Sequence, residues 1–459
     1  MGGCGMVAAV GWGRKPQRRG VPSVFRQMCS VEDGFPVSDQ EQSVSLPLPG
    51  AFLDFLNNNG LDPSIYAVAD TIPRYVRLKP GCESLLADIE AELRCKLEEV
   101  VWLPGFFSIP PHIQIAGSKA YQQGVIYGMD AASGAAVSAL DVSPGDHVLD
   151  LCAAPGAKLC MLSDLLGNSG SLTGVDIARH RLAACCTMLQ KYALGDCCRL
   201  FVADGTTFSL LPLRSCMDIK SGAAYGADNK DIFTEWTSKR SWKDRKKAFK
   251  ARNANSSHQS QSTLEPELIY YGRHSGVVGL CKSELFRPRN DNEPSVSGYD
   301  RVCHLGAGPC MLSMEAGSAY RPFTGTKSVL VDAECTHDGS VKHIQKFAFW
   351  GWNTLQHRVL DAKRTDTLMH LQLHLLTNGF RLLRVGGSLV YSTCSLTVAQ
   401  NEHVVEHFLA RNSSAELREV DLADKWPCKS GRIPKTIRFD PTTSKTSGLF
   451  IAKFTKLTT

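Results

Sequence analysis

Two cysteines follow apolar segments that have the composition of buried β-strands. Cys394 comes after "GGSLVYST", and Cys335 comes after "KSVLVDAE", which also contains Asp332. In a doubly wound sheet, ligands bind at the carboxyl ends of the strands. A thiol placed there is a candidate nucleophile. A disulfide bond between the two cysteines, or simple packing of small side chains, is the alternative interpretation.

The segment "DLCAAPGAK" (150–158) also follows an apolar segment, "HVL". Its small residues allow a ligand to approach the backbone, and the helix expected after it presents free N–H groups. It is neither G-x-G-x-x-G nor a P-loop, because Leu159 follows Lys158 where a P-loop has Ser or Thr. We interpret it as a candidate binding loop for a nucleotide-like cofactor. Its small residues are Ala153, Ala154, Gly156 and Ala157.

Two acids end the next two apolar segments along the chain. Asp176 ends "TGVD", and Asp204 ends "LFVAD". In a doubly wound fold, an acid at the first of these positions accepts hydrogen bonds from ribose hydroxyls. The second acid could meet an adenine amino group, so the pair fits an adenosyl cofactor. Helix capping by each aspartate is the alternative.

The elements that must position these residues alternate between strand and helix from Tyr127 onward. This alternation predicts an α/β fold, Rossmann-like, with a doubly wound and mostly parallel sheet. We therefore expect a domain over residues 126–459, interrupted by a long insertion at about 209–325. That insertion is rich in Ser, Asn, Gly and charge, with weak periodicity.

A smaller α+β module is expected over residues 47–125. Residues 74–80 are predicted to form a strand, residues 82–97 an amphipathic helix and residues 98–110 a second strand. Residues 1–46 show no periodicity. The first 31 of them contain no acid, which fits either a disordered basic tail or an organellar presequence.

Composition sets limits on the kind of protein. The chain has a net charge of +6, which permits an acidic partner such as RNA without requiring one. No apolar run is long enough to span a membrane. The 17 cysteines include no C-x-x-C pair, so we expect no metal site and a reducing compartment.

Basic residues in two places are candidates for RNA contact. The stretch 236–253 interleaves Lys and Arg with aromatic side chains that suit stacked bases. A solvated run of charge is the alternative there. In the N-terminal module, Arg74, Arg77 and Lys79 are candidates for docking RNA, against the alternative of an ordinary charged surface.

Three motifs together resemble those of the Sun (RsmB-like) family of RNA cytosine-5 methyltransferases. They are "DLCAAPGAK", "VDA-C" and "GGSLVYSTCSLT--QNE-VV--FL", which match in order and spacing. The segments "GMDAAS" and "TSGLFIAKFTK" also resemble this family. The resemblance covers roughly residues 120–455 apart from the insertion, and it implies an S-adenosylmethionine-dependent enzyme that forms 5-methylcytosine in rRNA or tRNA.

The resemblance also implies a role for each site residue. Cys394 would add to C6 of the target cytosine, Cys335 would assist product release, and Asp332 would hydrogen-bond the base. Asp332 would also bind the cofactor. The cofactor itself would be held by Cys152, Ala153, Ala154, Pro155, Gly156, Ala157, Lys158, Asp176 and Asp204.

The chain departs from the family pattern around the second cysteine. It has Glu334-Cys335-Thr336-His337 where the family usually has Pro-Cys-Ser-Gly. A carboxylate there would raise the pKa of the Cys335 thiol. A milder change is Ala157, where the family prefers Gly.

Other functions remain open on the sequence alone. A catalytically inactive RNA-binding or assembly relative is one alternative, and a methyltransferase acting on DNA or protein is another. We expect a monomer by default. The nucleus or nucleolus, the cytoplasm and an organelle are all open as locations.

Overall fold

The computed structural model describes residues 48–167, 170–195, 198–212, 265–272, 286–289, 328–332 and 335–457. These residues all belong to one compact unit, 40–459. The N-terminal segment 1–46, Glu334 and the basic stretch 236–253 lie outside them, so the predictions made for these parts stay predictions. The boundaries proposed for the two domains also stay predictions.

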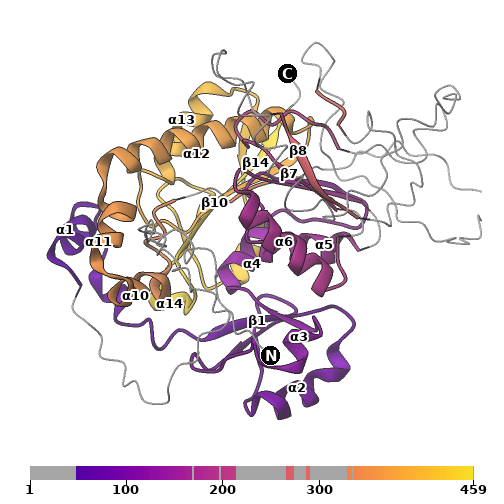
Figure 1. Ribbon diagram of the computed structural model, residues 1–459. Coiled ribbons are helices and arrows are strands. Elements are labelled where there is room, and N and C mark those ends of the chain that lie inside the picture. The colour runs from indigo at the N-terminus through magenta and orange to yellow at the C-terminus, as the bar shows by residue number, and fades with distance from the viewer. Residues whose placement is uncertain are drawn as a thin grey trace, which may run out of the picture. The chain divides into compact units, whose positions relative to one another are not determined.

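Five parallel strands form the centre of a large sheet (Figure 1). Strand β5 lies in the middle, with β6 and β7 on one side and β9 and β10 on the other. The strand order therefore reverses beside β5, which is the point where doubly wound sheets bind ligands. In sheet order the five are β10 (Ser388–Thr393), β9 (Ser328–Asp332), β5 (His147–Asp150), β6 (Ser171–Asp176) and β7 (Cys198–Val202).

Antiparallel strands extend this sheet on both sides, so the predicted α/β fold is confirmed, with a mixed sheet to which the described residues contribute ten strands. Strand β8 (Glu267–Tyr271) pairs with β7, although it lies inside the predicted insertion. At the other side β14 pairs with β10 and with two further strands. The strands on that side are β11 (Ala415–Arg418), β12 (Lys429–Ser430), β13 (Ile437–Phe439) and β14 (Leu449–Lys456).

Helices cover both faces of the sheet (Figure 1). The side chain of Val148 belongs to a core shared with α5, and that of Leu149 belongs to a core shared with α12. Successive side chains of a strand point to opposite faces, so a strand buried on both sides carries apolar residues on both. The helices on the first face are α4 (Ala131–Ser138), α5 (Ala157–Leu166) and α6 (Arg179–Lys191), and those on the second are α12 (Ala362–Leu382) and α13 (Glu402–Arg411).

A second, antiparallel sheet of four strands has the order β2-β3-β1-β4. The sequence predicted one strand over residues 98–110, and this was wrong: the segment forms two short strands that pair with each other. Pro104 and Gly105 separate them, and Gly105 has a φ of 79°, which favours glycine. The strands are β1 (Arg74–Leu78), β2 (Glu98–Glu99), β3 (Phe106–Ile109) and β4 (Ile126–Gly128), with the helices α2 (Leu86–Leu93) and α3 (Lys119–Gln122).

This small sheet is tied to α5 and to the residues after α6. The Nε atom of Arg77 lies 3.2 Å from Oδ2 of Asp164, and both side chains are buried. Tyr127 donates a hydrogen bond to the same oxygen at 3.0 Å. Lys79 donates to the carbonyl of Tyr192 at 2.5 Å. The prediction that Arg77 docks RNA was therefore wrong, because its guanidinium stabilises an internal contact.

The remaining elements complete the first region of the chain and the segment after β9. Helix α1 (Gly50–Asn58) and η2 (Pro63–Tyr66) share an apolar core with α10 (Val341–Trp350). Among the described residues, no helix is both long enough and apolar enough to cross a membrane. The other short helices are η3 (Glu83–Leu85), α11 (Trp352–Leu355), η4 (Gln356–Leu360), η5 (Asp421–Lys425) and α14 (Pro441–Ser444).

Candidate active site

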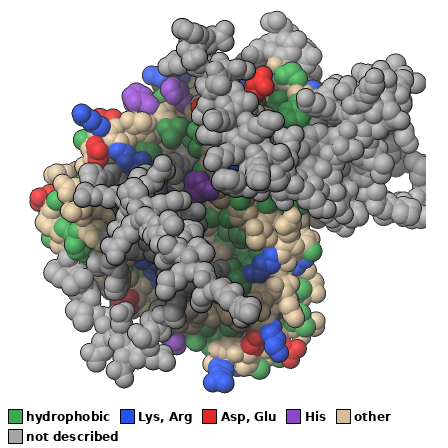
Figure 2. Space-filling model, in the orientation of Figure 1, with side chains coloured by type: hydrophobic (Ala, Val, Ile, Leu, Met, Phe, Trp, Pro, Cys, Tyr) green, Lys and Arg blue, Asp and Glu red, His purple; other side chains and the backbone are tan. Residues whose placement is uncertain are grey.

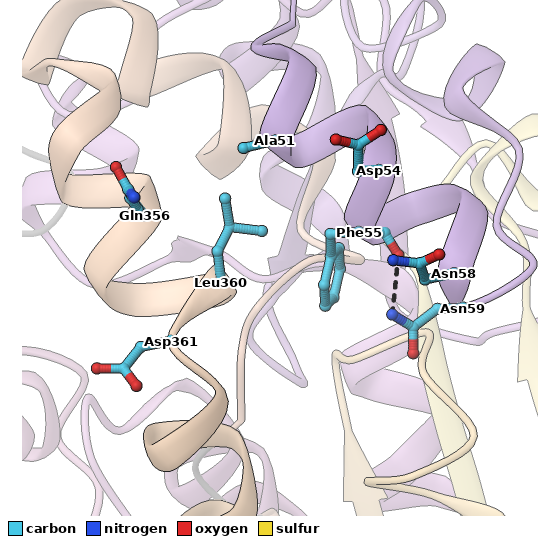
Figure 3. A pocket seen from close by; sticks show the side chains of 8 residues that line it. All are labelled: Ala51, Asp54, Phe55, Asn58, Asn59, Gln356, Leu360 and Asp361. Atoms are coloured by element: carbon cyan, nitrogen blue, oxygen red, sulfur yellow. Dashed lines mark hydrogen bonds between the residues drawn. The ribbon is translucent and has the colours of Figure 1, made fainter.

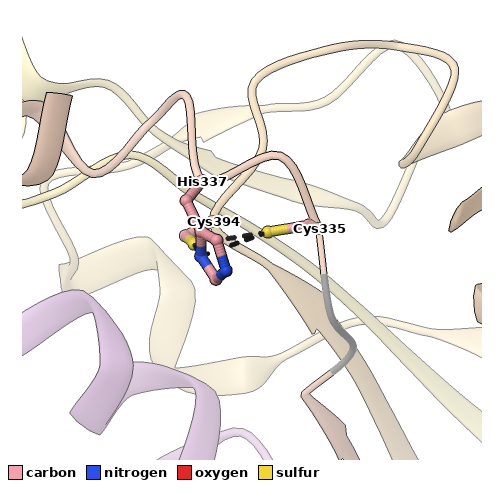
Figure 4. Close-up of side chains that lie close together, drawn as sticks. All are labelled: Cys335, His337 and Cys394. Carbon is pink, nitrogen blue, oxygen red and sulfur yellow. Dashed lines mark hydrogen bonds between the residues drawn. The ribbon is translucent and has the colours of Figure 1, made fainter. Parts of the chain in front are cut away.

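The structure brings the two predicted thiols together. Cys394 follows β10, Cys335 follows β9, and these strands are parallel neighbours with Ser392 opposite Asp332. The two Sγ atoms lie 3.4 Å apart, and both cysteines are free (Figure 4). The alternative of a disulfide bond is therefore not realised in this structure, and the two sulfur atoms lie together at the end of the sheet.

Backbone amides donate hydrogen bonds between the loop after β9 and the loop after β10. Gly339 N donates to Cys394 O at 2.8 Å, Leu396 N donates to Asp338 Oδ2 at 2.7 Å, and Thr336 N donates to Gln400 Oε1 at 3.1 Å. A Cβ atom at Gly339 would lie 2.5 Å from Cys394 O, so only glycine allows this approach. The two loops are thus fixed relative to each other.

The hydroxyl residues beside Cys394 shape its turn. Thr393 donates a hydrogen bond to Asn401 Oδ1 at 2.6 Å and accepts one from Ser395 N at 3.1 Å. Asn401 donates to Ser395 O at 2.8 Å. The sequence "TCSLT--QN" is therefore a hydrogen-bonded turn that leaves the central thiol half-buried while its neighbours are buried.

The surroundings shift the pKa values of the two thiols in opposite directions. A hydrogen bond from Cys335 and the positive charge of His337 hold the pKa of Cys394 well below its ordinary value, although burial opposes them. Burial, followed by the interaction with Cys394, raises the pKa of Cys335 well above its ordinary value. The arrangement therefore favours one thiolate, at Cys394, beside one neutral thiol.

His337 is a site residue that the sequence analysis did not assign. Its Nδ1 atom lies 3.0 Å from Cys394 Sγ and 3.7 Å from Cys335 Sγ (Figure 4). Its φ of 58° lies in the left-handed region, where glycine is the usual residue. The signal was present in the sequence, because His337 stands where the resembling family has Gly.

The predicted cofactor loop lies between β5 and α5. Gly156 has a φ of 116°, and a Cβ atom there would lie 3.2 Å from Cys185 Cα. Arg181, which the sequence analysis did not select, donates to Ala154 O at 2.8 Å. The same guanidinium lies 3.7 Å from Asp176 Oδ2. Arg181 therefore connects the loop to the acid at the end of β6.

The other predicted cofactor residues lie at the same edge of the sheet. Cys152 N donates to Asp150 Oδ1, and Lys158 Nζ donates to Ser133 Oγ. Asp204 follows β7, and its Oδ1 accepts hydrogen bonds from the amide and hydroxyl of Thr206. For Asp332 the structure describes the backbone, which ends β9 beside Cys335. The assignments of these residues to the cofactor stay predictions.

Ile177 is a third residue that the sequence analysis did not select. It follows Asp176 directly, and 65% of its surface is exposed. An exposed apolar side chain beside a buried acid suits a ligand that has both a hydroxyl-bearing ring and a flat apolar face. An apolar residue immediately after a strand-end acid was the signal available.

The described surface away from the strand ends gives weaker indications of a functional site. A hollow between α1 and η4 is lined by residues that include Asp54, Phe55 and Asp361, and it contains no predicted site residue (Figure 3). On the face drawn in Figure 2, Lys and Arg side chains of the described residues are interspersed with acidic ones and form no large patch. The described side chains on this face thus do not identify an RNA-binding surface.

Comparison with known proteins identifies the family. The model of the 16S rRNA methyltransferase RsmB/F family matches residues 137–218 and 317–455. The chain belongs to the RsmB/F methyltransferase family. This confirms the resemblance carried by the three motifs, and it places both cysteine loops and the β5–α5 loop inside the matched region.

Individual relatives agree with this assignment. The rRNA (cytosine-C(5))-methyltransferase NOP2C of Arabidopsis thaliana is 24% identical over 69% of this chain and 51% of its own length. The tRNA (cytosine(49)-C(5))-methyltransferase of Pyrococcus abyssi is 33% identical over 32% of this chain and 47% of its own length. The chain thus spans about half the length of these curated relatives.

A solved structure supports the fold. NSun6 from Pyrococcus horikoshii, in a crystal structure with SFG, superposes with a TM-score of 0.55 over 90% of this chain and 99% of that chain. Its sequence identity is 14%, so the likeness concerns the fold alone. The Rossmann-like arrangement predicted from strand and helix alternation is confirmed.

Proposed function

We propose that this member of the RsmB/F family is an S-adenosylmethionine-dependent methyltransferase that forms 5-methylcytosine in rRNA or tRNA. The observation that carries the proposal is the approach of Cys335 and Cys394, 3.4 Å apart, at the ends of adjacent strands β9 and β10. These ends lie beside β5, whose loop is the candidate cofactor loop. Relatives named as RNA cytosine-C5 methyltransferases support the same chemistry.

Cytosine C5 is a weak nucleophile, which explains the need for a thiol. The Cys394 thiolate would form a bond to C6, and the electrons of the C5–C6 double bond would move to C5. S-adenosylmethionine supplies the methyl group that C5 then takes. After loss of the C5 proton, the bond between Cys394 and C6 would break and restore the double bond. The target base must leave its stack to reach Cys394.

Residues next to Cys394 would assist both the formation and the breaking of its bond to C6. The charge of His337 stabilises the Cys394 thiolate before attack and after departure. Cys335 stays neutral because burial raises its pKa, so it can donate a hydrogen bond to the departing sulfur. Asp332 at the end of β9 is the candidate partner for the edge of the base.

The residues at the ends of β5 and β6 fit an adenosyl cofactor. Gly156 lets the loop pack closely against α6, and Arg181 holds this loop against Asp176. Asp176 is the candidate acceptor for ribose hydroxyls. Ile177 is the candidate apolar contact for the base. These residues would bind and orient the cofactor.

The test is to trap the covalent adduct with the Cys335→Ala variant. The purified variant would be incubated with total cellular RNA and S-adenosylmethionine, and the products would be separated on a denaturing gel. We expect a band of protein bound to RNA, because the thiol that assists departure is absent while Cys394 remains. Sequencing of the attached RNA would name the substrate and the cytosine.

The matched control is Cys335→Ala combined with Cys394→Ala, which should give no band. Binding of S-adenosylmethionine by both variants would show that they are folded. A band in the double variant would place the nucleophile elsewhere. No band from either variant, together with no methylation by the unmodified protein, would favour the non-catalytic RNA-binding alternative.

A further inference from the structure

Three atoms that suit a transition metal lie together at the ends of β9 and β10. Cys335 Sγ, His337 Nδ1 and Cys394 Sγ all lie within 4.8 Å of one another (Figure 4). Thiolate sulfur and imidazole nitrogen are the ligands that Zn²⁺ prefers in proteins. The same two thiols and one imidazole, with an open fourth position, also form a known type of zinc site in enzymes.

The distances match a tetrahedral site closely. Bond lengths of about 2.3 Å to sulfur and about 2.0 Å to nitrogen place two sulfurs roughly 3.8 Å apart, and sulfur and nitrogen roughly 3.6 Å apart. In this structure the sulfurs are 3.4 Å apart, and His337 Nδ1 lies 3.7 Å from Cys335 Sγ and 3.0 Å from Cys394 Sγ. Shifts of about half an ångström would bring all three ligands to ideal positions.

The scaffold around these ligands is already assembled. The hydrogen bonds from Gly339 to Cys394 O and from Leu396 to Asp338 fix the two loops against each other. His337 is held between them in a left-handed conformation, and its ring lies 6.0 Å from that of His343. A site formed in advance requires little ordering when a ligand binds.

We propose that Cys335, His337 and Cys394 bind one zinc ion, with a fourth position open to water. Cys394 is already favoured as a thiolate, so binding would release the proton of the Cys335 thiol and one proton of the His337 imidazolium to solvent. This inference opposes the expectation of a metal-free protein drawn from the absence of C-x-x-C. The ligands come from two loops far apart in sequence, which a search for short spacings does not detect.

Zinc binding would inactivate the proposed methyl transfer. The Cys394 electron pair that must attack C6 would be shared with the metal instead. This consequence rests on the proposed function, whereas metal binding rests on the geometry alone. The replacement of the family's Gly by His337 would thus give this chain a sensitivity to zinc that the family's pattern of residues does not provide.

The test uses the full chain in reduced, metal-free form, without RNA. Titration with Co²⁺ should give one ion per protein and an absorption band from thiolate-to-cobalt charge transfer, and Zn²⁺ should remove this band. His337→Gly restores the family residue and suits the left-handed backbone. It should weaken binding by at least about tenfold, since loss of groups outside the ligand shell already costs this much.

Residue-specific alkylation distinguishes this site from the other cysteines. Zinc should protect Cys394 from iodoacetamide, while Cys428, a half-buried free cysteine, should react equally with and without zinc. Cys394→Ser should lose the cobalt band, and Cys428→Ser should keep it. The proposal is overturned if the band survives in Cys394→Ser, or if zinc leaves the alkylation of Cys394 unchanged.

Failure of the two proposals can be told apart. Cobalt binding and alkylation do not depend on methylation, so a metal site in a protein without methyltransferase activity would support this inference and not the proposed function. A covalent RNA adduct that zinc does not suppress, from a protein that shows no cobalt band, would support the proposed function and contradict the zinc site.

Discussion

At the scale of single residues, Gly156 shows how the cofactor loop depends on one backbone conformation. Its φ of 116° is one that side chains rarely adopt, and the contact to Cys185 leaves little room for a Cβ atom. The loop that would approach the cofactor is therefore fixed by a residue without a side chain, and by its packing against α6.

We expect Gly156→Ala to lower the free energy of unfolding by about 1–2 kcal/mol, because the left-handed conformation costs that much for a residue with a side chain. Affinity for S-adenosylmethionine should fall as well. The control is Gly117→Ala, at an exposed position with no atom within contact distance of a new Cβ. Urea denaturation of both variants is the measurement, and equal stabilities would contradict the argument.

Glu402 provides a prediction for pH. Burial raises its pKa, but the hydrogen bonds and charge of Arg438 outweigh this, and its pKa in the folded protein lies below the ordinary value. Arg438 Nε lies 2.8 Å from Glu402 Oε1. A depressed pKa means that the carboxylate stabilises the fold above the unfolded-state pKa of about 4.3, and that this stabilisation is lost as pH falls through the folded-state pKa.

Glu402→Gln should therefore be less stable than the unmodified protein at pH 7 and should approach it in stability at acidic pH. Urea midpoints measured from pH 7 to about pH 3, which extends below the unfolded-state pKa, would test this. Glu416, which is partly exposed and paired with the exposed Arg418 at 3.4 Å, offers Glu416→Gln as a control with little effect at either pH. If the difference in stability between Glu402→Gln and the unmodified protein stays constant with pH, the lowered pKa of Glu402 is contradicted.

At the scale of elements, the small antiparallel sheet is held to α5 by a buried ion pair. Arg77 pairs with Asp164, and the same carboxylate oxygen accepts a hydrogen bond from the Tyr127 hydroxyl. Burial raises the pKa of Asp164 despite the neighbouring Arg77. Removing one partner of a buried pair leaves a charge or polar group without compensation, whereas removing both can be nearly neutral.

Arg77→Met should thus lower the free energy of unfolding by about 3 kcal/mol. The double variant Arg77→Met/Asp164→Leu should recover much of this loss. The exposed pair of Lys96 and Glu90 is the control, and Lys96→Met should cost less than about 1 kcal/mol. If the single and double variants unfold at the same urea concentration, the pair does not act as a buried unit.

At the scale of the whole molecule, the sequence predicted best what depends on local periodicity. Strand β10, "SLVYST", is buried along its whole length, and its apolar residues Leu389, Val390 and Tyr391 are consecutive rather than alternating. The glycine-containing loop after β5 likewise follows a short apolar run. The meeting of Cys335 and Cys394 also followed, because neighbouring parallel strands end at one edge of the sheet.

What the sequence did not show depends on contacts between distant segments. Arg77 has the composition of a surface residue, and only the position of Asp164 on α5 reveals that it is buried. His337 is a ligand candidate only because the turn after β9 directs it towards Cys394. Strand β8 is a short segment whose partner, β7, lies on the other side of a long stretch of chain.

Strand β8 leads to a prediction about the insertion. It covers the edge of β7, whose Leu200 and Phe201 are fully buried. Next to Pro212, Leu211 N donates a hydrogen bond to Arg287 O at 2.9 Å. The buried Arg199 guanidinium donates to the Leu211 carbonyl. The residues on both sides of the gap 213–264 are therefore bound into the sheet.

A variant that lacks residues 213–264, with Pro212 joined to Glu265 by a short linker, keeps all of these contacts. We expect it to remain soluble and to unfold within about 1 kcal/mol of the unmodified protein, because shortening a loop changes its closure entropy only slightly. A variant that lacks residues 209–325 would expose the apolar edge of β7 as an unpaired strand and should aggregate. Size-exclusion chromatography and urea denaturation would compare the two. Aggregation of both variants would show that the sheet needs more of the insertion than β8.

The shorter deletion also removes the basic stretch 236–253. A loss of RNA affinity in a variant of unchanged stability would therefore locate the RNA contact there.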